Sequence, residues 1–127
     1  MRFNNDRPIF LQIADYLTRE VIAGRLPPGE RIQSARELAA SLEVNPNTAT
    51  RALQELADSG VARCERGTGY WVADNGPAQA REQQKRRFYE SELPGLFRTM
   101  DELDISWPEL AERYQKRHAE PGVKEKS

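Results

Sequence analysis

The feature that most constrains this chain is a pair of helix start signals that lie close together. The run from Ser34 to Glu37 matches a capping box, in which the serine side chain accepts from a first-turn amide and the glutamate reaches back to the serine amide. Asn45-Pro46 is a second start, because asparagine caps helices and proline suits the first helical position. The sequence therefore predicts two short helices separated by a turn of about four residues, which is the layout of a helix-turn-helix unit.

The flanking segments complete this unit. Residues 9–22 carry apolar side chains at helical spacing and predict a first helix with one buried stripe. Residues 61–65 and 70–73 predict two strands around a glycine-bearing turn, and Arg31-Ile32 leaves room for a short extended piece. Three helices followed by a hairpin are a winged helix-turn-helix. The stripe of the first helix consists of Ile9 or Phe10, Ile13, Leu17 and Val21.

The pattern changes at Asn75-Gly76-Pro77, where we place the end of the first domain. Residues 78–92 are polar on nearly every face and predict an exposed connecting helix that ends near Leu93-Pro94. The predicted fold is mostly α with a small β-hairpin. Its parts are a winged helix-turn-helix domain at 1–74, a helical dimerisation segment at 75–117 and a disordered tail at 118–127.

Two short helices are predicted after Pro94, the second opened by another capping box at 106–109. They carry more apolar surface than two helices can bury alone. A stripe of this kind is far more often a helix-packing face than the wall of a pocket, so we predict a homodimer interface. A pocket for a small-molecule effector between the dimer's C-terminal helices is the alternative. The stripe consists of Leu93, Leu96, Phe97, Met100, Leu103, Trp107, Leu110 and Tyr114.

Several classes of protein are not expected. The chain has no apolar run suited to a signal peptide or a membrane span, so we expect it in the cytoplasm without a membrane partner. Cys64 is the single cysteine, which rules out an intramolecular disulfide and leaves a thiolate metal site without ligands. We expect Cys64 to be a small buried filler of a strand. The single histidine, His118, lies in the predicted tail, and no catalytic set or phosphate loop is present, so neither an enzyme nor a cofactor is expected.

Five runs form a recognisable pattern: Arg36-Glu37-Leu38-Ala39, Val44-Asn45-Pro46-Asn47-Thr48, Arg51-Ala52-Leu53, Glu55-Leu56 and Gly60. Their order resembles the DNA-binding domain of the GntR family of bacterial regulators. The Val44–Thr48 run and the short C-terminal segment resemble the YtrA-like subgroup, whose members carry a helical dimerisation segment in place of an effector domain. The resemblance implies a sequence-specific transcriptional regulator that controls a neighbouring transporter operon. As a homodimer it would bind a palindromic operator, and repression is the simpler mechanism.

The second helix of such a unit presents its first turn to the major groove of DNA. Asn47, Thr48 and Thr50 are predicted to read base edges, and Arg51 to fork onto guanine or grip a phosphate. The alternative is that such residues only cap the helix or face solvent. The predicted DNA contacts are Ser34, Arg36, Asn45, Asn47, Thr48, Thr50, Arg51, Arg66, Gly67 and Thr68.

Two further groups of contacts flank this helix. Arg36 lies in the first turn of the preceding helix, where a cation is unfavourable unless an external anion compensates it, and the resemblance places it at the edge of the groove. Arg66 at the hairpin tip suits a narrow minor groove, while Gly67 allows close backbone approach. For Gly67 turn geometry alone is the other explanation, and for Ser34 helix capping alone.

Net charge is unusual for a nucleic-acid binder, at −1 with a pI near 5.9. Residues 1–74 hold nine Arg and no Lys against ten Asp or Glu. A DNA-binding surface must therefore come from charges sorted onto one face, with affinity that depends on a few placed arginines. The weak overall attraction also permits a second hypothesis, a winged-helix protein-interaction module without sequence-specific DNA binding.

Overall fold

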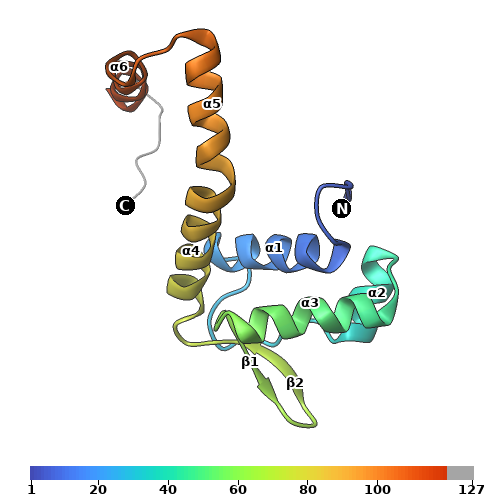
Figure 1. Ribbon diagram of the computed structural model, residues 1–127. Coiled ribbons are helices and arrows are strands. Elements are labelled where there is room, and N and C mark those ends of the chain that lie inside the picture. The colour runs from blue at the N-terminus through green and yellow to red at the C-terminus, as the bar shows by residue number, and fades with distance from the viewer. Residues whose placement is uncertain (120–127) are drawn as a thin grey trace. The chain divides into compact units, whose positions relative to one another are not determined.

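The computed structural model describes residues 1–119, which divide into a first compact unit, residues 1–86, and a second unit that begins at Arg87 (Figure 1). The elements that begin in the first unit are α1 (Ile9–Ile22), α2 (Ala35–Leu42), α3 (Pro46–Asp58), β1 (Ala62–Glu65), β2 (Gly69–Val72) and α4 (Gly76–Arg87). Three helices followed by a two-stranded hairpin confirm the predicted winged helix-turn-helix.

The core of the first unit lies where α1, α2, α3 and the base of the hairpin meet. Ile13, Leu17 and Val21 of the predicted stripe are buried. Ile9 is exposed, whereas Phe10 packs at the edge of the core, so Phe10 begins the stripe. The face of α3 that completes the core consists of Ala49, Ala52, Leu53 and Leu56.

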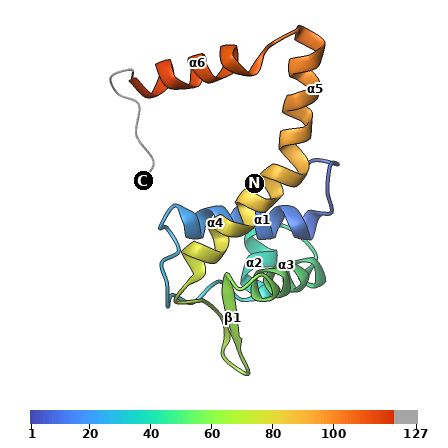
Figure 2. The ribbon, with the colours of Figure 1, turned by 60° about the vertical axis from the view of Figure 1, so that its left-hand side comes forward.

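The hairpin is antiparallel, with Cys64 opposite Tyr70. The predicted extended piece before α2 lies against the hairpin through a single bridge: Arg31 pairs with Trp71, and the Ile32 amide donates to the Tyr70 carbonyl at 2.8 Å. From its buried base the hairpin projects beyond α3, on the side away from α1 (Figure 1, Figure 2).

Cys64 is exposed, so the buried filler predicted for it is wrong. Ala62 and Cys64 share one face of β1, because side chains two residues apart lie on the same side of a strand. Ala62 is buried at the base of the hairpin, whereas Cys64 lies farther toward the tip, where the strand has left the core. Alternation along a strand identifies a face but not the point at which burial ends.

The first unit continues into α4, although the sequence placed the domain boundary before it. Gly76 is buried, and a Cβ at this position would lie 2.8 Å from the carbonyl oxygen of Val61 and 2.9 Å from a methyl of Val72. A glycine is therefore what allows α4 to begin against the base of the hairpin. The signal that looked like a break is a close packing contact.

Further along α4, two residues fix the helix to the same unit. Ala80 is fully buried. Gln84 donates its amide N–H to Oδ1 of Asp15 on α1 at 2.8 Å, and Nη1 of Arg7 lies 3.3 Å from Oδ2 of the same carboxylate. The polar helix predicted as exposed therefore has one packed side.

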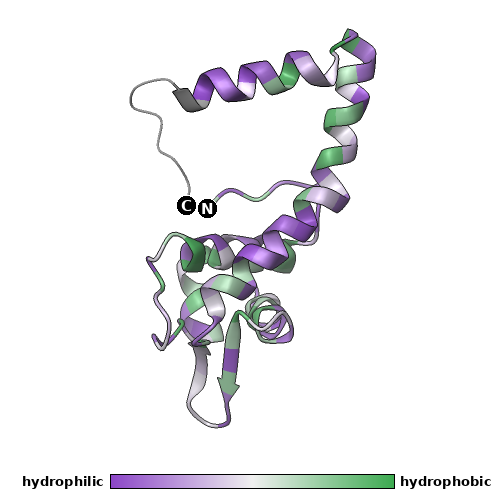
Figure 3. Ribbon diagram, turned by 90° about the vertical axis from the view of Figure 1, so that its left-hand side faces the viewer, coloured by the Kyte–Doolittle hydropathy of each residue, from purple (hydrophilic) through white to green (hydrophobic). Residues whose placement is uncertain are grey.

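The second unit contains a π-helix, η1 (Phe88–Glu92), followed by α5 (Leu93–Leu103) and α6 (Trp107–Ala119). The helix end predicted near Leu93-Pro94 is absent, because the backbone is helical at every residue from 76 to 103. Pro94 lies in the first turn of α5, where a missing N–H costs little, and the wider π turn comes directly before it. Figure 3 shows hydrophobic positions along α5 after the hydrophilic course of α4.

α5 ends at Leu103, and the C-cap residue Asp104 has a left-handed backbone with φ 58°. Ser106 then accepts from the Glu109 amide at 3.3 Å, as its predicted cap requires. α6 reaches Ala119, into the tail predicted at 118–127, and the rest of that segment lies outside the described residues. No helix in residues 1–119 has the length and apolar character needed to cross a membrane.

Candidate nucleic-acid interface

Both helices of the helix-turn-helix begin with the caps predicted for them. Ser34 Oγ accepts from the Glu37 amide at 3.1 Å, and Oε1 of Glu37 accepts from the Ser34 amide at 2.9 Å. These bonds with Ser34, together with the charge of Arg31, hold the pKa of Glu37 below its ordinary value of 4.5. At the start of α3, Oδ1 of Asn45 accepts from the Asn47 amide at 2.7 Å. Ser34 and Asn45 therefore position the two helix N-termini, whatever else they contact.

The face of α3 opposite the core is the candidate reading surface. Asn47 is exposed in its first turn, while Thr48 and Thr50 are half-buried beside it. The Thr50 hydroxyl donates to the Pro46 carbonyl at 3.0 Å, which leaves its methyl group and an oxygen lone pair for another partner. Asn47 thus has the freest polar side chain of the predicted base readers.

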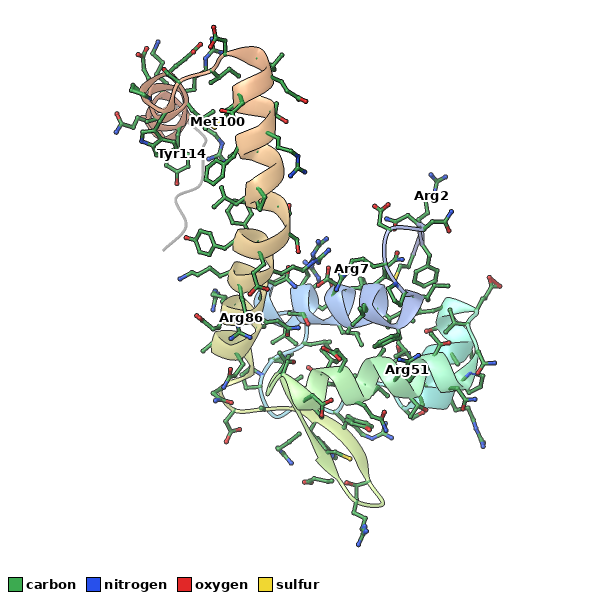
Figure 4. The ribbon with its side chains drawn as sticks, viewed as in Figure 1. Arg2, Arg7, Arg51, Arg86, Met100 and Tyr114 are labelled. Carbon is green, nitrogen blue, oxygen red and sulfur yellow. The ribbon has the colours of Figure 1, made fainter. Side chains whose placement is uncertain are left out.

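Arg51 is exposed but already has a partner. Its guanidinium carbon lies 3.9 Å from the centre of the Phe10 ring, at the side of α3 that faces α1 (Figure 4). A flat guanidinium on an aromatic ring keeps its edge N–H groups free to donate. Arg51 therefore links two helices and keeps N–H groups with which to donate to another partner.

The sequence interpretation missed Gln54. Gln54 is exposed and follows Asn47 by seven residues. Seven residues are about two helical turns, so both side chains lie on the same face of α3. A glutamine can pair with an adenine edge through both amide atoms. Extending the helical period from Asn47 through Thr50 would have identified it.

The arginines before residue 75 differ in whether a carboxylate lies beside them. Five of the nine before residue 75 lie within 4 Å of a carboxylate: Arg7, Arg19, Arg25, Arg31 and Arg63. Arg36 and Arg66 are exposed, and neither forms a hydrogen bond or ion pair with another described residue. They lie at the N-terminus of α2 and at the hairpin tip. Two of the arginines without an ion pair therefore lie at predicted DNA contacts, whereas Arg2, Arg81 and Arg86 of the first unit lie outside them.

The hairpin tip is a tight turn held by Thr68. Its hydroxyl donates to the Glu65 carbonyl at 3.2 Å and accepts from the Trp71 indole at 3.4 Å. Gly67 has φ +81°, which explains glycine there by backbone geometry alone. Thr68 and Gly67 shape the turn, and Arg66 is the side chain that the turn presents.

The residues predicted to form the dimer interface all belong to the second unit, and most of their side chains are exposed to solvent. Met100 is only 8% exposed, and Leu93 and Leu110 are half-buried. Trp107 and Leu103 are each 65% exposed. The other exposed members are Leu96, Phe97 and Tyr114, and the exposed aromatics Phe88 and Tyr89 of η1 adjoin them in the sequence.

No group of three or more His, Cys, Asp and Glu side chains within residues 1–119 could hold a metal ion.

Comparison with known proteins gives consistent matches. Residues 10–72 match the family described as bacterial regulatory proteins, gntR family. YhcF of Bacillus subtilis, an uncharacterized HTH-type transcriptional regulator, is 32% identical over 111 residues, which cover 87% of this chain and 90% of that protein. The HTH-type transcriptional repressor YtrA of the same organism is 35% identical over 68 residues, 54% of this chain and 52% of that protein. A solved GntR family transcriptional regulator from Listeria monocytogenes has a TM-score of 0.71 at 30% identity, with 90% of this chain and 98% of that chain covered.

Proposed function

Because the chain belongs to the GntR family of DNA-binding bacterial transcriptional regulators, we propose that it is a YtrA-like homodimeric repressor that reads a palindromic operator. It is a regulator rather than an enzyme. The observation that carries the proposal is that two exposed arginines without an ion pair, Arg36 and Arg66, lie at the start of α2 and at the hairpin tip, the elements that precede and follow α3 in the sequence.

In this proposal α3 lies in the major groove. Asn47, Thr48, Thr50 and Gln54 face base edges, and Arg51 donates to a phosphate from its place on Phe10. The amides at the N-termini of α2 and α3 favour phosphate, and Arg36 adds a full charge at the same edge. Arg66 enters the adjacent minor groove at the hairpin tip.

A second copy of the chain covers the apolar residues of the second unit. A helix whose Trp107 and Tyr114 are more than half exposed leaves a large apolar surface in water. Two-fold pairing of such a surface is the commonest way in which soluble proteins bury it. Dimerisation would place two α3 helices about one DNA turn apart, as a palindrome requires.

Repression is the mode of action that needs fewest further surfaces, because a bound dimer blocks polymerase by occupying the promoter. The protein would work in the cytoplasm, and the regulated genes would include a neighbouring transporter operon. The YtrA protein of Bacillus subtilis, which carries the name of a repressor, supports this choice. A reporter gene placed behind the operator found by the duplex selection described below tests whether the protein represses or activates. Repression requires reporter output to rise when the regulator is deleted.

The experiment that tests the proposal is selection from a randomised duplex pool. The wild type is compared with an Arg36→Ala, Arg66→Ala double variant and with an Arg19→Ala, Arg25→Ala control. Both variants lose two positive charges, but Arg19 and Arg25 are ion-paired on the α1 side of the unit. A palindrome enriched by the wild type and the control but not by the first variant supports the proposal. A folded wild type that enriches nothing overturns it and favours the protein-interaction module.

A further inference from the structure

Arg31 connects three parts of the first unit that are separate in the sequence. Its Nε–H donates to the carbonyl oxygen of Thr68 in the hairpin turn at 3.3 Å. Its Nη1 lies 3.5 Å from Oε1 of Glu37, the oxygen that accepts from the Ser34 amide in the α2 capping box. The backbone of Arg31 also pairs with Trp71 on β2. One guanidinium thus joins the hairpin turn to the start of the helix-turn-helix.

Gly69 leaves room for this arrangement. A Cβ at Gly69 would lie 3.4 Å from Nη2 and 3.5 Å from Nε of Arg31, and the φ of +116° is unfavourable for other residues. The Arg31 side chain is 44% exposed, so it does not fill the core. Its contacts instead hold two surface elements against each other.

We propose that Arg31 is a positioning residue for the hairpin, which sets where Arg66 stands relative to Arg36 and so controls the minor-groove contact. This inference rests on the proposed DNA contacts. Arg31 itself is partly compensated by Glu37, whereas Arg66 forms no ion pair with another described residue. The guanidinium is required because its fixed fork donates to the Thr68 carbonyl through Nε while Nη1 lies in ion-pair distance of Glu37, which a single ammonium group cannot match.

A double-mutant cycle on operator affinity tests the inference, with Arg31→Ala, Arg66→Ala and the double variant measured at one salt concentration. Each single variant is expected to weaken binding about tenfold. If Arg31 acts through the hairpin tip, the double variant is also about tenfold weaker. A loss near a hundredfold would mean that Arg31 contacts DNA independently, which overturns the inference.

Footprinting supplies a readout that general destabilisation would not produce. Arg31→Ala should lose protection of the minor groove beside each half-site and keep protection of the major-groove bases, while the domain stays folded at the assay temperature. Arg31→Lys should resemble Arg31→Ala, and full rescue by lysine would indicate a simple phosphate contact and sink the inference.

Arg63→Ala is the matched control. Arg63 lies on the same hairpin, ion-paired at 2.6 Å with Glu65 and 5.8 Å from the centre of the Trp71 ring. Within the described residues it forms no hydrogen bond or ion pair with the hairpin turn or with α2, so its loss should leave the footprint unchanged. An equal loss of minor-groove protection in this variant would contradict a specific role for Arg31. Failure of the wild type to bind any duplex would overturn the proposed function as well, whereas an additive cycle overturns the positioning role alone.

Discussion

The guanidinium of Arg51 stacks on the ring of Phe10 at 3.9 Å and thereby connects the middle of α3 to the first turn of α1. The contact joins a predicted DNA-binding residue to an aromatic residue at the edge of the core. Arg51 therefore has a structural role in the free protein, and a loss of binding in an Arg51 variant has two causes that must be separated.

The first prediction concerns this pair. In a double-mutant cycle of Arg51→Ala and Phe10→Leu, unfolding by urea should give a coupling of about 0.5–1 kcal/mol, the range for an exposed cation–π contact. Arg51→Ala should then weaken operator binding by more than the stability loss accounts for. Additive stability effects would show that the stacking is not energetically significant.

The second prediction concerns Gly76. A methyl group at this position meets the Val61 carbonyl at 2.8 Å, so Gly76→Ala should destabilise the protein by roughly 1–3 kcal/mol through overpacking. Thermal unfolding measures the effect. Gly95→Ala in α5 is the control, because a Cβ there meets nothing closer than 3.6 Å. The control should be neutral or stabilise by about 0.5–1 kcal/mol, and equal losses in both variants would argue against the close contact.

The third prediction concerns pH. The pKa of Glu37 is lowered in the folded state, mainly by the Ser34 amide, so its carboxylate contributes stability above the ordinary value of 4.5. That contribution is lost as pH falls through the lower folded pKa. The stability difference between the wild type and Glu37→Gln should therefore be constant near neutral pH and shrink in acid below 4.5. A difference independent of pH would mean that the charge plays no part in the cap.

The fourth prediction concerns association. If the proposed dimer forms through the apolar stripe of the second unit, Trp107→Ala should raise its dissociation constant at least about tenfold, since a large aromatic side chain in an interface is commonly a hot spot. Sedimentation equilibrium measures it. Lys116→Ala is the control, because Lys116 is ion-paired with Glu112 of α6 at 3.2 Å. A wild type that is monomeric throughout the accessible concentrations would refute the prediction.

The winged helix could be derived from the sequence because its signals are local. The capping pair Ser34 and Glu37 and the start at Asn45-Pro46 act within one helical turn, and each forms as predicted. The same holds for the position of Arg66 in a glycine-bearing turn. Local hydrogen bonding decides these features, so the sequence alone contains the information.

The remaining features depend on contacts between distant segments. The carbonyl oxygen of Val61 leaves no room for a Cβ at Gly76, and the Thr68 carbonyl accepts a hydrogen bond from the Arg31 guanidinium. No spacing rule predicts either contact. Cys64 is exposed because the hairpin extends beyond the core at that point, and the sequence does not show how far the hairpin extends. The π-helix before Pro94 is an adjustment of hydrogen bonding that leaves no periodic signal.

The internal compensation of five arginines has a consequence for the search for a target in the genome. A regulator competes with an enormous excess of unrelated DNA, which captures proteins through phosphate charge alone. Carboxylates lie beside Arg7, Arg19, Arg25, Arg31 and Arg63, which reduces the attraction that these five residues offer to such DNA. If the chain reads an operator as proposed, fewer copies would be sequestered at random sites, and a smaller number of molecules per cell would suffice to occupy one promoter.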